Sequence, residues 1–93
     1  MTYHIKFTNA YKKSYKRAKK RGLNLKLLND VVEALGQGYK LDAKYHDHAL
    51  HGNLEGFREC HIQPDWLLIY LVENDVLTLT LVETGTHADI FDE

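Results

Sequence analysis

Cysteine and proline are almost missing from the 93-residue sequence, and long apolar runs are missing altogether. With Cys60 as the single cysteine, no disulfide can form within the chain, which excludes a secreted mini-domain stapled by disulfides. No apolar run approaches the roughly 20 residues that span a bilayer, and the first residues lack the apolar stretch of a signal peptide. We therefore expect a cytoplasmic protein that does not insert into membranes.

The charge is strongly segregated along a chain whose formal net charge is only −1. Residues 1–44 carry a net charge of +8, and residues 45–93 carry −9. Such a basic cluster is typical of a surface that binds a polyanion or an acidic partner, although a solvated helix face gives the same pattern. Candidate contacts to a polyanion on this predicted helix face are Lys12, Lys16, Lys19 and Lys20.

The succession of hydrophobic patterns predicts a single α+β domain over residues 1–93. Residues 3–7 alternate as in a strand, and apolar side chains then recur at helical spacing in two segments that begin at Thr8 or Asn9 and at Asn24. An irregular stretch, 39–54, separates these helices from three predicted strands. The strands are expected at 56–62, 66–72 and 76–82, with a short helix or turn at 87–91.

The predicted architecture is an N-terminal strand, an antiparallel helical hairpin packed on a mostly antiparallel twisted sheet, and a short C-terminal helix or turn. Turns are indicated at residues 63–65 and 73–75, and residues 84–86 are expected to break the last strand. Leu77, Leu79 and Leu81 alternate with threonines, which predicts a buried face for all three leucines. The second face and one end of this sheet remain open for a site.

Five of the six histidines lie in the second half of the chain. His61 and Asp65 flank one predicted turn, and the last strand folds back so that His87 returns to the same end of the sheet. Two imidazoles and a carboxylate in one site can serve as general acid and general base without a metal ion. RNA suits such a site because its 2′-hydroxyl is an internal nucleophile next to the phosphorus.

Arg58 is the single Lys or Arg beyond Lys44, and its guanidinium is suited to a bidentate grip on phosphate. A structural ion pair with Glu55, Glu59 or Asp65 is the alternative.

Trp66 and Phe91 are candidates for stacking on a base, with packing in the core as the alternative for both. The histidines of residues 46–51 match no standard zinc spacing, and we expect neither a metal nor another cofactor. Cys60 is interpreted as a small buried residue of a strand rather than a nucleophile.

Three stretches carry a resemblance to a known family. Residues 50–70 with their Pro-Asp-Trp turn, residues 83–91 with their Gly-Thr-His sequence, and residues 45–48 closely resemble the YafQ-type branch of the RelE/ParE toxin superfamily. The resemblance covers essentially the whole chain and implies a RelE-like fold. It implies the toxin of a type II toxin–antitoxin module, a metal-independent endoribonuclease that cuts mRNA on the ribosome.

The resemblance also implies roles for single residues. The family's acid–base residues fall on His48, His61, Asp65 and His87, with His87 as the expected general acid. His61 and Asp65 are expected to supply or orient the base, and His48 to assist from the loop. Arg58 is expected to hold the phosphate, and Trp66 and Phe91 to shape the nucleotide site.

The expected partners are mRNA, the ribosome and a cognate antitoxin of ribbon–helix–helix type, whose disordered acidic segment folds over the toxin. Operator DNA is expected only through the antitoxin. Two alternatives stay open at this point. One is a non-enzymatic ParE-like toxin that inhibits DNA gyrase, and the other is a catalytically vestigial toxin that acts with its antitoxin as a repressor. The histidines and Asp65 argue against the gyrase inhibitor, because an inhibitor needs no acid–base set, whereas the repressor stays open.

Overall fold

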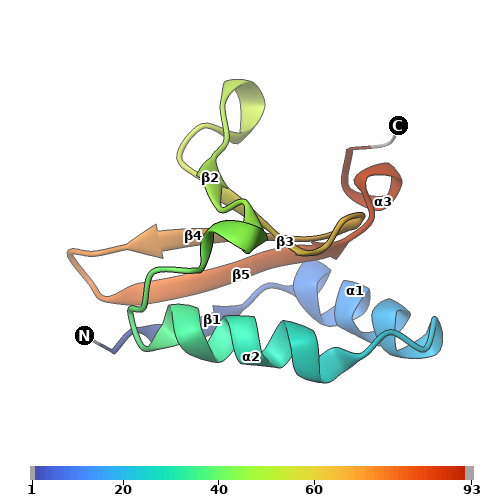
Figure 1. Cartoon of the computed structure of the whole chain (residues 1–93). Coiled ribbons are helices and arrows are strands. Elements are labelled where there is room, and N and C mark those ends of the chain that lie inside the picture. The colour runs from blue at the N-terminus through green and yellow to red at the C-terminus, as the bar shows by residue number, and fades with distance from the viewer. Residues whose placement is uncertain (1, 92–93) are drawn as a thin grey trace.

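The computed structural model describes residues 2–91 and confirms the predicted α+β class (Figure 1). In chain order its elements are β1 (His4–Phe7), α1 (Asn9–Lys20), α2 (Leu25–Gly36), β2 (His48–Ala49), β3 (Arg58–Gln63), β4 (Trp66–Glu73), β5 (Thr78–Gly85) and α3 (His87–Phe91). Two short 3-10 turns lie on either side of β2, at Ala43–Tyr45 and Gly52–Leu54. Within residues 2–91, no helix combines the length and apolar character that crossing a membrane requires.

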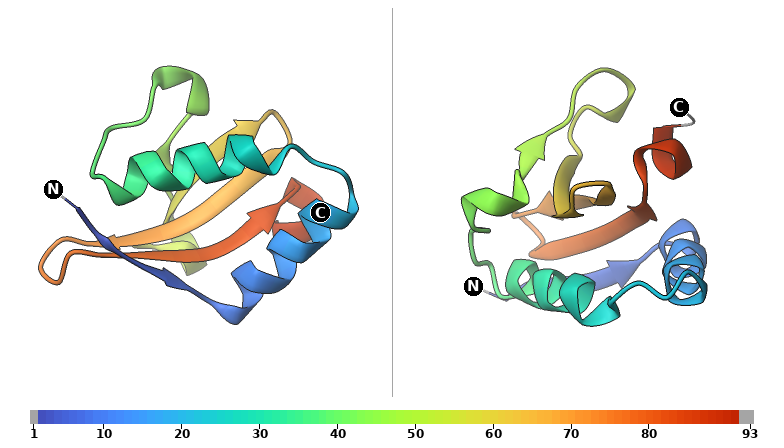
Figure 2. Two further views of the ribbon diagram at one scale, coloured as in Figure 1. Left: turned by 90° about the horizontal axis from the view of Figure 1, so that it is seen from below. Right: turned by 45° about the vertical axis from the view of Figure 1, so that its right-hand side comes forward.

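One five-stranded sheet, in the order β1-β5-β4-β3-β2, forms the centre of the molecule. The β2–β3, β3–β4 and β4–β5 pairs are antiparallel, whereas β1 lies parallel to β5. Helices α1 and α2 run in opposite directions along one face of this twisted sheet, and α3 stands on the other side (Figures 1 and 2). The site described below lies on the side that α1 and α2 leave open.

The helices begin where the sequence predicts them. The Thr8 hydroxyl accepts a hydrogen bond from the Tyr11 amide at 3.0 Å, and the Asn24 side chain accepts one from the Lys26 amide at 3.2 Å. Each bond satisfies an amide that has no partner within its helix. Gly22 ends the first helix with a φ of +76°, a left-handed conformation that glycine adopts without a steric penalty.

The main core lies between the sheet and the two long helices. Leu28, Leu68, Leu79 and Leu81 are fully buried there, as is Cys60. Burial raises the pKa of the Cys60 thiol to about 12, so that the thiol stays protonated at neutral pH. The structure therefore confirms the interpretation of Cys60 as a buried core residue.

The opposite face of the sheet carries the polar side chains of β3. Strand alternation turns Cys60 toward the helices, and it turns Glu59 and His61 away from them. Glu59 pairs with Ile69 of β4, and His61 pairs with Leu67. Both β4 residues are buried outside the main core, which explains why β4 carries apolar side chains on both faces of the sheet.

Three details of the predicted fold were wrong. Strand β5 begins only at Thr78 and continues to Gly85, so residues 84–86 do not break it as expected. Leu77 lies in the turn before β5 with a φ of +48° and is exposed, because the β4–β5 turn extends further than residues 73–75. The segment 39–54 is not wholly irregular, since β2 pairs its two residues with Arg58 and Glu59.

Asp89 fastens α3 to the end of α1. Its carboxylate accepts hydrogen bonds from the Arg21 guanidinium at 2.6 and 3.2 Å and from the Thr86 amide at 2.9 Å. The Thr86 hydroxyl accepts in return from the Asp89 amide at 3.0 Å, which forms a reciprocal cap. These contacts hold the start of α3, and with it His87, at a fixed position over the sheet.

The contacts of Asp89 predict a specific acid sensitivity. Hydrogen bonds from Arg21 and Thr86 lower the pKa of Asp89 well below the unfolded value of about 3.9. The carboxylate therefore stabilises the fold above that pH, and this stability is lost as the pH falls toward the folded pKa. We expect urea unfolding to show a smaller loss of stability between about pH 5 and 3 in Asp89→Asn than in the wild type. Equal losses in the two proteins would contradict this role.

Candidate active site

His87 and Asp65 form the best-defined pair of the site. The Asp65 carboxylate lies in the β3–β4 turn and accepts hydrogen bonds from the His87 amide at 2.9 Å and from its Nδ1 at 2.6 Å. These bonds lower the pKa of Asp65, so that its carboxylate is ionised at neutral pH. An ionised carboxylate can only accept, which places a proton on Nδ1 of His87 and directs chemistry to Nε2.

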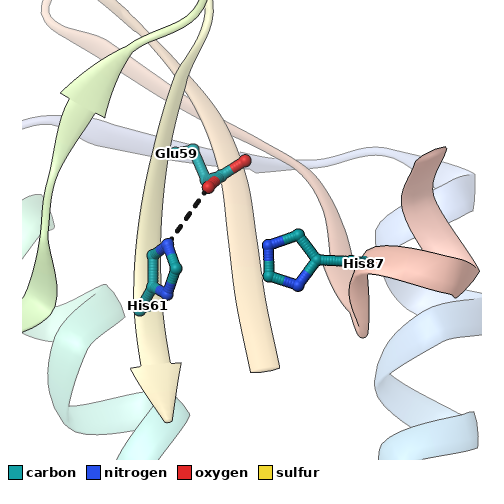
Figure 3. A group of neighbouring side chains, drawn as sticks. All are labelled: Glu59, His61 and His87. Atoms are coloured by element: carbon teal, nitrogen blue, oxygen red, sulfur yellow. Dashed lines mark ion pairs between the residues drawn. The ribbon is translucent and has the colours of Figure 1, made fainter. Parts of the chain in front are cut away.

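Glu59 and His61 lie beside His87 on β3 (Figure 3). Glu59 Oε1 is 3.3 Å from His61 Nε2, and the His61 and His87 rings are 5.9 Å apart between centroids. Glu59 is only 5% exposed, whereas the two imidazoles are partly open to solvent. Donor atoms of all three side chains lie within 4.8 Å of one another, a spacing at which they could hold a metal ion.

The edge strand β2 brings further histidines to the same place. His48 pairs with Glu59 across the strands, and its Nε2 is 3.7 Å from Glu59 Oε1. The His46 carbonyl lies 2.6 Å from His48 Nδ1 and can only accept, so neutral His48 carries its proton on Nδ1. The ring of His46 lies 5.6 Å from that of His61. Tyr45, His46, His48, His61 and Pro64 line an open groove.

Asp47 holds the loop between these two histidines. Its carboxylate accepts a hydrogen bond from the Tyr70 hydroxyl at 2.5 Å and one from Arg58 Nε at 3.3 Å. Because Asp47 stands between His46 and His48, these bonds tie the loop that carries both histidines to β3 and β4. His46 itself adopts a left-handed φ of +49°, which turns the chain into β2 at this point.

Asp47 also changes the interpretation of Arg58. We expected Arg58 to hold phosphate, or to pair with Glu55, Glu59 or Asp65. The structure instead pairs it with Asp47 and places it opposite Tyr70, on the sheet face turned away from Glu59 and His61. The expected phosphate contact at the histidines is therefore not supported by this arrangement.

The two aromatic candidates differ in their surroundings. Trp66 is 3% exposed within the main core, and its indole N–H donates to the Thr84 hydroxyl at 2.9 Å. A ring so enclosed has no free face for a base, so the expected direct contact with a nucleotide is wrong. Phe91 ends α3, and its ring centroid lies 6.3 Å from that of His87.

The four candidate lysines lie on a different element from the histidines. Lys12, Lys16, Lys19 and Lys20 belong to α1, which covers the opposite face of the sheet from α3 (Figures 1 and 2). Lys12 and Lys16 border an apolar hollow formed by Phe7, Tyr11 and Tyr15. These two lysines can therefore meet a partner on a surface separate from the groove lined by the histidines.

The structure thus brings together His48, His61, Asp65 and His87, the four predicted acid–base candidates, and it adds Glu59. Sequence analysis treated Glu59 only as a possible partner of Arg58. The sequence did allow its position to be predicted, because residues 59 and 61 of one strand point to the same face of the sheet. What the sequence could not show is that His48 and His87 approach the same carboxylate from other elements.

These groups can accept a proton on one side of a bound phosphodiester and donate a proton on the other side. His87 Nε2 faces Glu59 and His61 (Figure 3), while the hydrogen bond from Nδ1 to Asp65 fixes the orientation of the ring. Imidazoles at such separations can protonate one oxygen of a phosphodiester and accept a proton from another. The adjacent carboxylates stabilise an imidazolium as it forms.

Two solved structures that share this fold are bacterial toxins. YafQ in the DinJ–YafQ toxin–antitoxin complex of Escherichia coli gives a TM-score of 0.90 at 35% sequence identity, with 98% of this chain and 99% of that chain covered. A metal-bound toxin from Helicobacter pylori gives 0.89 at 42% identity, with 98% and 100% covered. The fold and its site thus define a small toxin of the RelE/ParE type.

Sequence comparisons give the family. The profile described as "Bacterial toxin of type II toxin-antitoxin system, YafQ" matches residues 3–92. The mRNA interferase toxin YafQ of Escherichia coli K12 is 36% identical over 88 residues, which are 94% of this chain and 94% of that protein. The chain belongs to the YafQ family of type II toxin–antitoxin toxins, and its relatives named mRNA interferases are endoribonucleases.

Proposed function

We propose that this chain, acting as one domain, is an mRNA interferase that cleaves messages on the ribosome without a metal ion. The single observation that supports this best is the Asp65–His87 pair, whose outer imidazole nitrogen faces Glu59 and His61. Proton transfer by imidazoles is sufficient for RNA cleavage because the 2′-hydroxyl supplies the nucleophile.

The proposed reaction is an in-line attack of the 2′-oxygen on the adjacent phosphorus. The P–O5′ bond breaks as the new bond forms, which leaves a 2′,3′-cyclic phosphate and a free 5′-hydroxyl. His61 takes the proton of the 2′-hydroxyl, with Glu59 stabilising the resulting imidazolium, and His87 gives a proton to the leaving 5′-oxygen. His48, when protonated on Nε2 as well as on Nδ1, donates to the phosphoryl oxygens and stabilises their charge.

Asp65 receives a different role from the one that the sequence indicated. We expected it to act beside the base, together with His61. Its two hydrogen bonds go to His87, so we assign it as a positioning residue that fixes the tautomer of the general acid. Phe91, next to His87, is proposed to contact the nucleotide.

The proposed partners follow the charge distribution. The lysines of α1 are proposed to meet ribosomal RNA phosphates while the histidine end receives mRNA. A cognate antitoxin, of ribbon–helix–helix type with an acidic wrapping segment, is proposed to neutralise the toxin and to connect it to operator DNA. All of these partners place the protein in the cytoplasm.

The reaction can be tested with a defined message on purified ribosomes. Primer extension locates the cut, and a second message carries a single 2′-deoxy substitution on the 5′ side of that cut. We expect the first message to be cleaved to a 2′,3′-cyclic phosphate even with a chelator that removes transition-metal ions but leaves the Mg²⁺ of the ribosome, and the second to stay intact. Cleavage of the 2′-deoxy message would overturn the mechanism, and DNA supercoiling inhibition without any RNA cleavage would favour a gyrase inhibitor.

A further inference from the structure

The open groove beside the histidines extends well beyond the acid–base groups. Its volume is about 730 Å³, within the range of roughly 300–1,000 Å³ that is typical of sites for small ligands, the size class of a nucleotide. Besides His48 and His61, the groove is lined by Leu27 of α2, by Lys44, Tyr45 and His46 of the segment before β2, and by residues 62–64. It therefore has room for a part of the substrate that the acid–base groups do not touch.

His61 lies between this groove and His87. Its ring centroid is 5.6 Å from that of His46 and 5.9 Å from that of His87. Figure 3 shows His61 on β3, with the pale green β2 on one side and α3, which carries His87, on the other. Of the residues between 2 and 91 that line the groove, none comes from α3. A substrate that spans both imidazoles therefore lays the part on the side of His61 into the groove.

The proposed chemistry gives this direction a meaning for RNA. His61 takes the proton of the 2′-hydroxyl, which belongs to the nucleotide on the 5′ side of the cut. His87 protonates the 5′-oxygen of the nucleotide on the 3′ side. The first nucleotide therefore lies toward the groove, and the second lies toward Phe91, whose ring centroid is 6.3 Å from that of His87.

Tyr45 and Lys44 provide the two contacts that a nucleotide in the groove requires. Tyr45 is half-buried against the core and borders the groove, so its ring is a fixed platform on which a base can stack. The Lys44 ammonium lies 5.2 Å from the centroid of this ring, which marks an accessible face. Base stacking is stronger than an exposed cation–π contact, so a base can replace the ammonium there.

The displaced lysine remains available for a phosphate. Lys44 is exposed, and no ion pair within residues 2–91 engages it. Since Arg58 is turned toward Asp47, Lys44 is the cationic side chain that borders the groove of the histidines.

We propose that this groove is the subsite for the nucleotide on the 5′ side of the cut. Its base stacks on Tyr45, and Lys44 holds the phosphate that precedes it. The inference rests on the proposed function, because the direction of the RNA follows from the roles of His61 and His87. It adds a base-binding platform at one end of the site and fixes the polarity with which the message crosses the sheet.

The subsite is tested with ribosome-bound messages in which one nucleotide beside the cut is a ribose spacer without a base. The spacer keeps the 2′-hydroxyl, so the reaction itself remains possible. We expect a spacer on the 5′ side to lower kcat/KM of the wild type by about 5–150-fold, the range for one base stacked on an aromatic ring. Tyr45→Leu keeps an apolar side chain against the core and is expected to show almost none of this penalty, whereas Tyr45→Phe is expected to retain it.

Tyr39→Leu is the matched control, because Tyr39 is an exposed tyrosine of the same connecting segment that lies outside the groove. Its 5′ penalty is expected to equal that of the wild type. An equal 5′ penalty in Tyr45→Leu and the wild type would overturn the subsite, even if the variant were slower on every message, as a purely structural role would make it. Circular dichroism establishes that each variant is folded.

A spacer on the 3′ side tests the polarity. We expect Tyr45→Leu to keep the wild-type penalty for this message, and loss of the 3′ penalty in place of the 5′ penalty would overturn the proposed direction. Lys44→Gln is expected to raise KM several-fold for all messages alike, and an unaltered KM would overturn the phosphate contact.

Two further outcomes separate this inference from other possibilities. Weaker antitoxin binding by Tyr45→Leu, with wild-type cleavage and a wild-type 5′ penalty, would overturn the subsite and assign the groove to the antitoxin. Failure of the wild type to cleave any message would overturn the proposed function and the subsite together, whereas failure of the subsite alone leaves cleavage of the intact message in place.

Discussion

Replacing His87 with glutamine lowers the rate of mRNA cleavage by a factor of about 10²–10⁴, the range expected when a general acid is lost. Glutamine is close in size and can still donate a hydrogen bond to Asp65, but it cannot give up a proton to the leaving 5′-oxygen. His87 lies at the partly exposed start of α3, outside the core, so the fold is expected to remain. Single-turnover cleavage of ribosome-bound mRNA and growth after induction measure the effect.

Two variants show whether the loss is specific to proton transfer. His51→Gln, on an exposed turn, is expected to cleave like the wild type. Asp65→Asn removes the carboxylate that fixes the His87 tautomer, and we expect a smaller loss together with a shifted pH–rate profile. Full activity of His87→Gln at matched folded content would refute the assignment, whereas unimpaired antitoxin binding by the inactive variant would support it.

Replacing Trp66 with alanine lowers the free energy of unfolding by about 3–5 kcal/mol, as is typical of a large aromatic side chain removed from a core. The ring lies among buried residues of the sheet and helices, and its N–H donates to Thr84. Because a small domain has only about 5–15 kcal/mol of stability, we expect a large loss of soluble, folded protein. Urea denaturation followed by circular dichroism measures the change.

Trp66→Phe separates the core role from a role in substrate binding. This variant keeps an aromatic ring but loses the hydrogen bond to Thr84 Oγ1, whose own proton still goes to the Leu67 carbonyl at 2.6 Å. We expect a loss of about 1–2 kcal/mol in stability and an unchanged cleavage rate per folded molecule. A strongly raised KM at unchanged stability would contradict the assignment of Trp66 to the core.

Helix boundaries were predicted well because their causes are local. Thr8 and Asn24 cap their helices through amides only two or three residues away, and Gly22 ends α1 by its own conformational freedom. The β4–β5 hairpin was less predictable, since the turn reaches Leu77, whose side chain fits a strand pattern equally well. Pairing with β4 and β1, rather than local preference, sets where β5 begins.

The features that the sequence analysis missed depend on contacts between residues that are far apart in the sequence. The two residues of β2 are too few to show a period, and they form a strand only because β3 lies beside them. Asp47 likewise has no local signal, because its partners Arg58 and Tyr70 come from two later strands. The burial of Trp66 follows from the helices that cover one face of the sheet, which the residue's own neighbours in sequence do not reveal.

The sequence by itself determined the α+β class, the caps of both long helices, the family, and the return of His87 to the turn that holds Asp65. Each of these follows from a local sequence pattern or from the number of residues in a hairpin, and both can be read directly from the sequence. Only the tertiary structure decided which side chains share the open face of the sheet. It placed Glu59 among the imidazoles, turned Arg58 toward Asp47, and packed α1, which carries the lysines, against the opposite face of the sheet, because contacts across strands depend on register and on which face the helices cover.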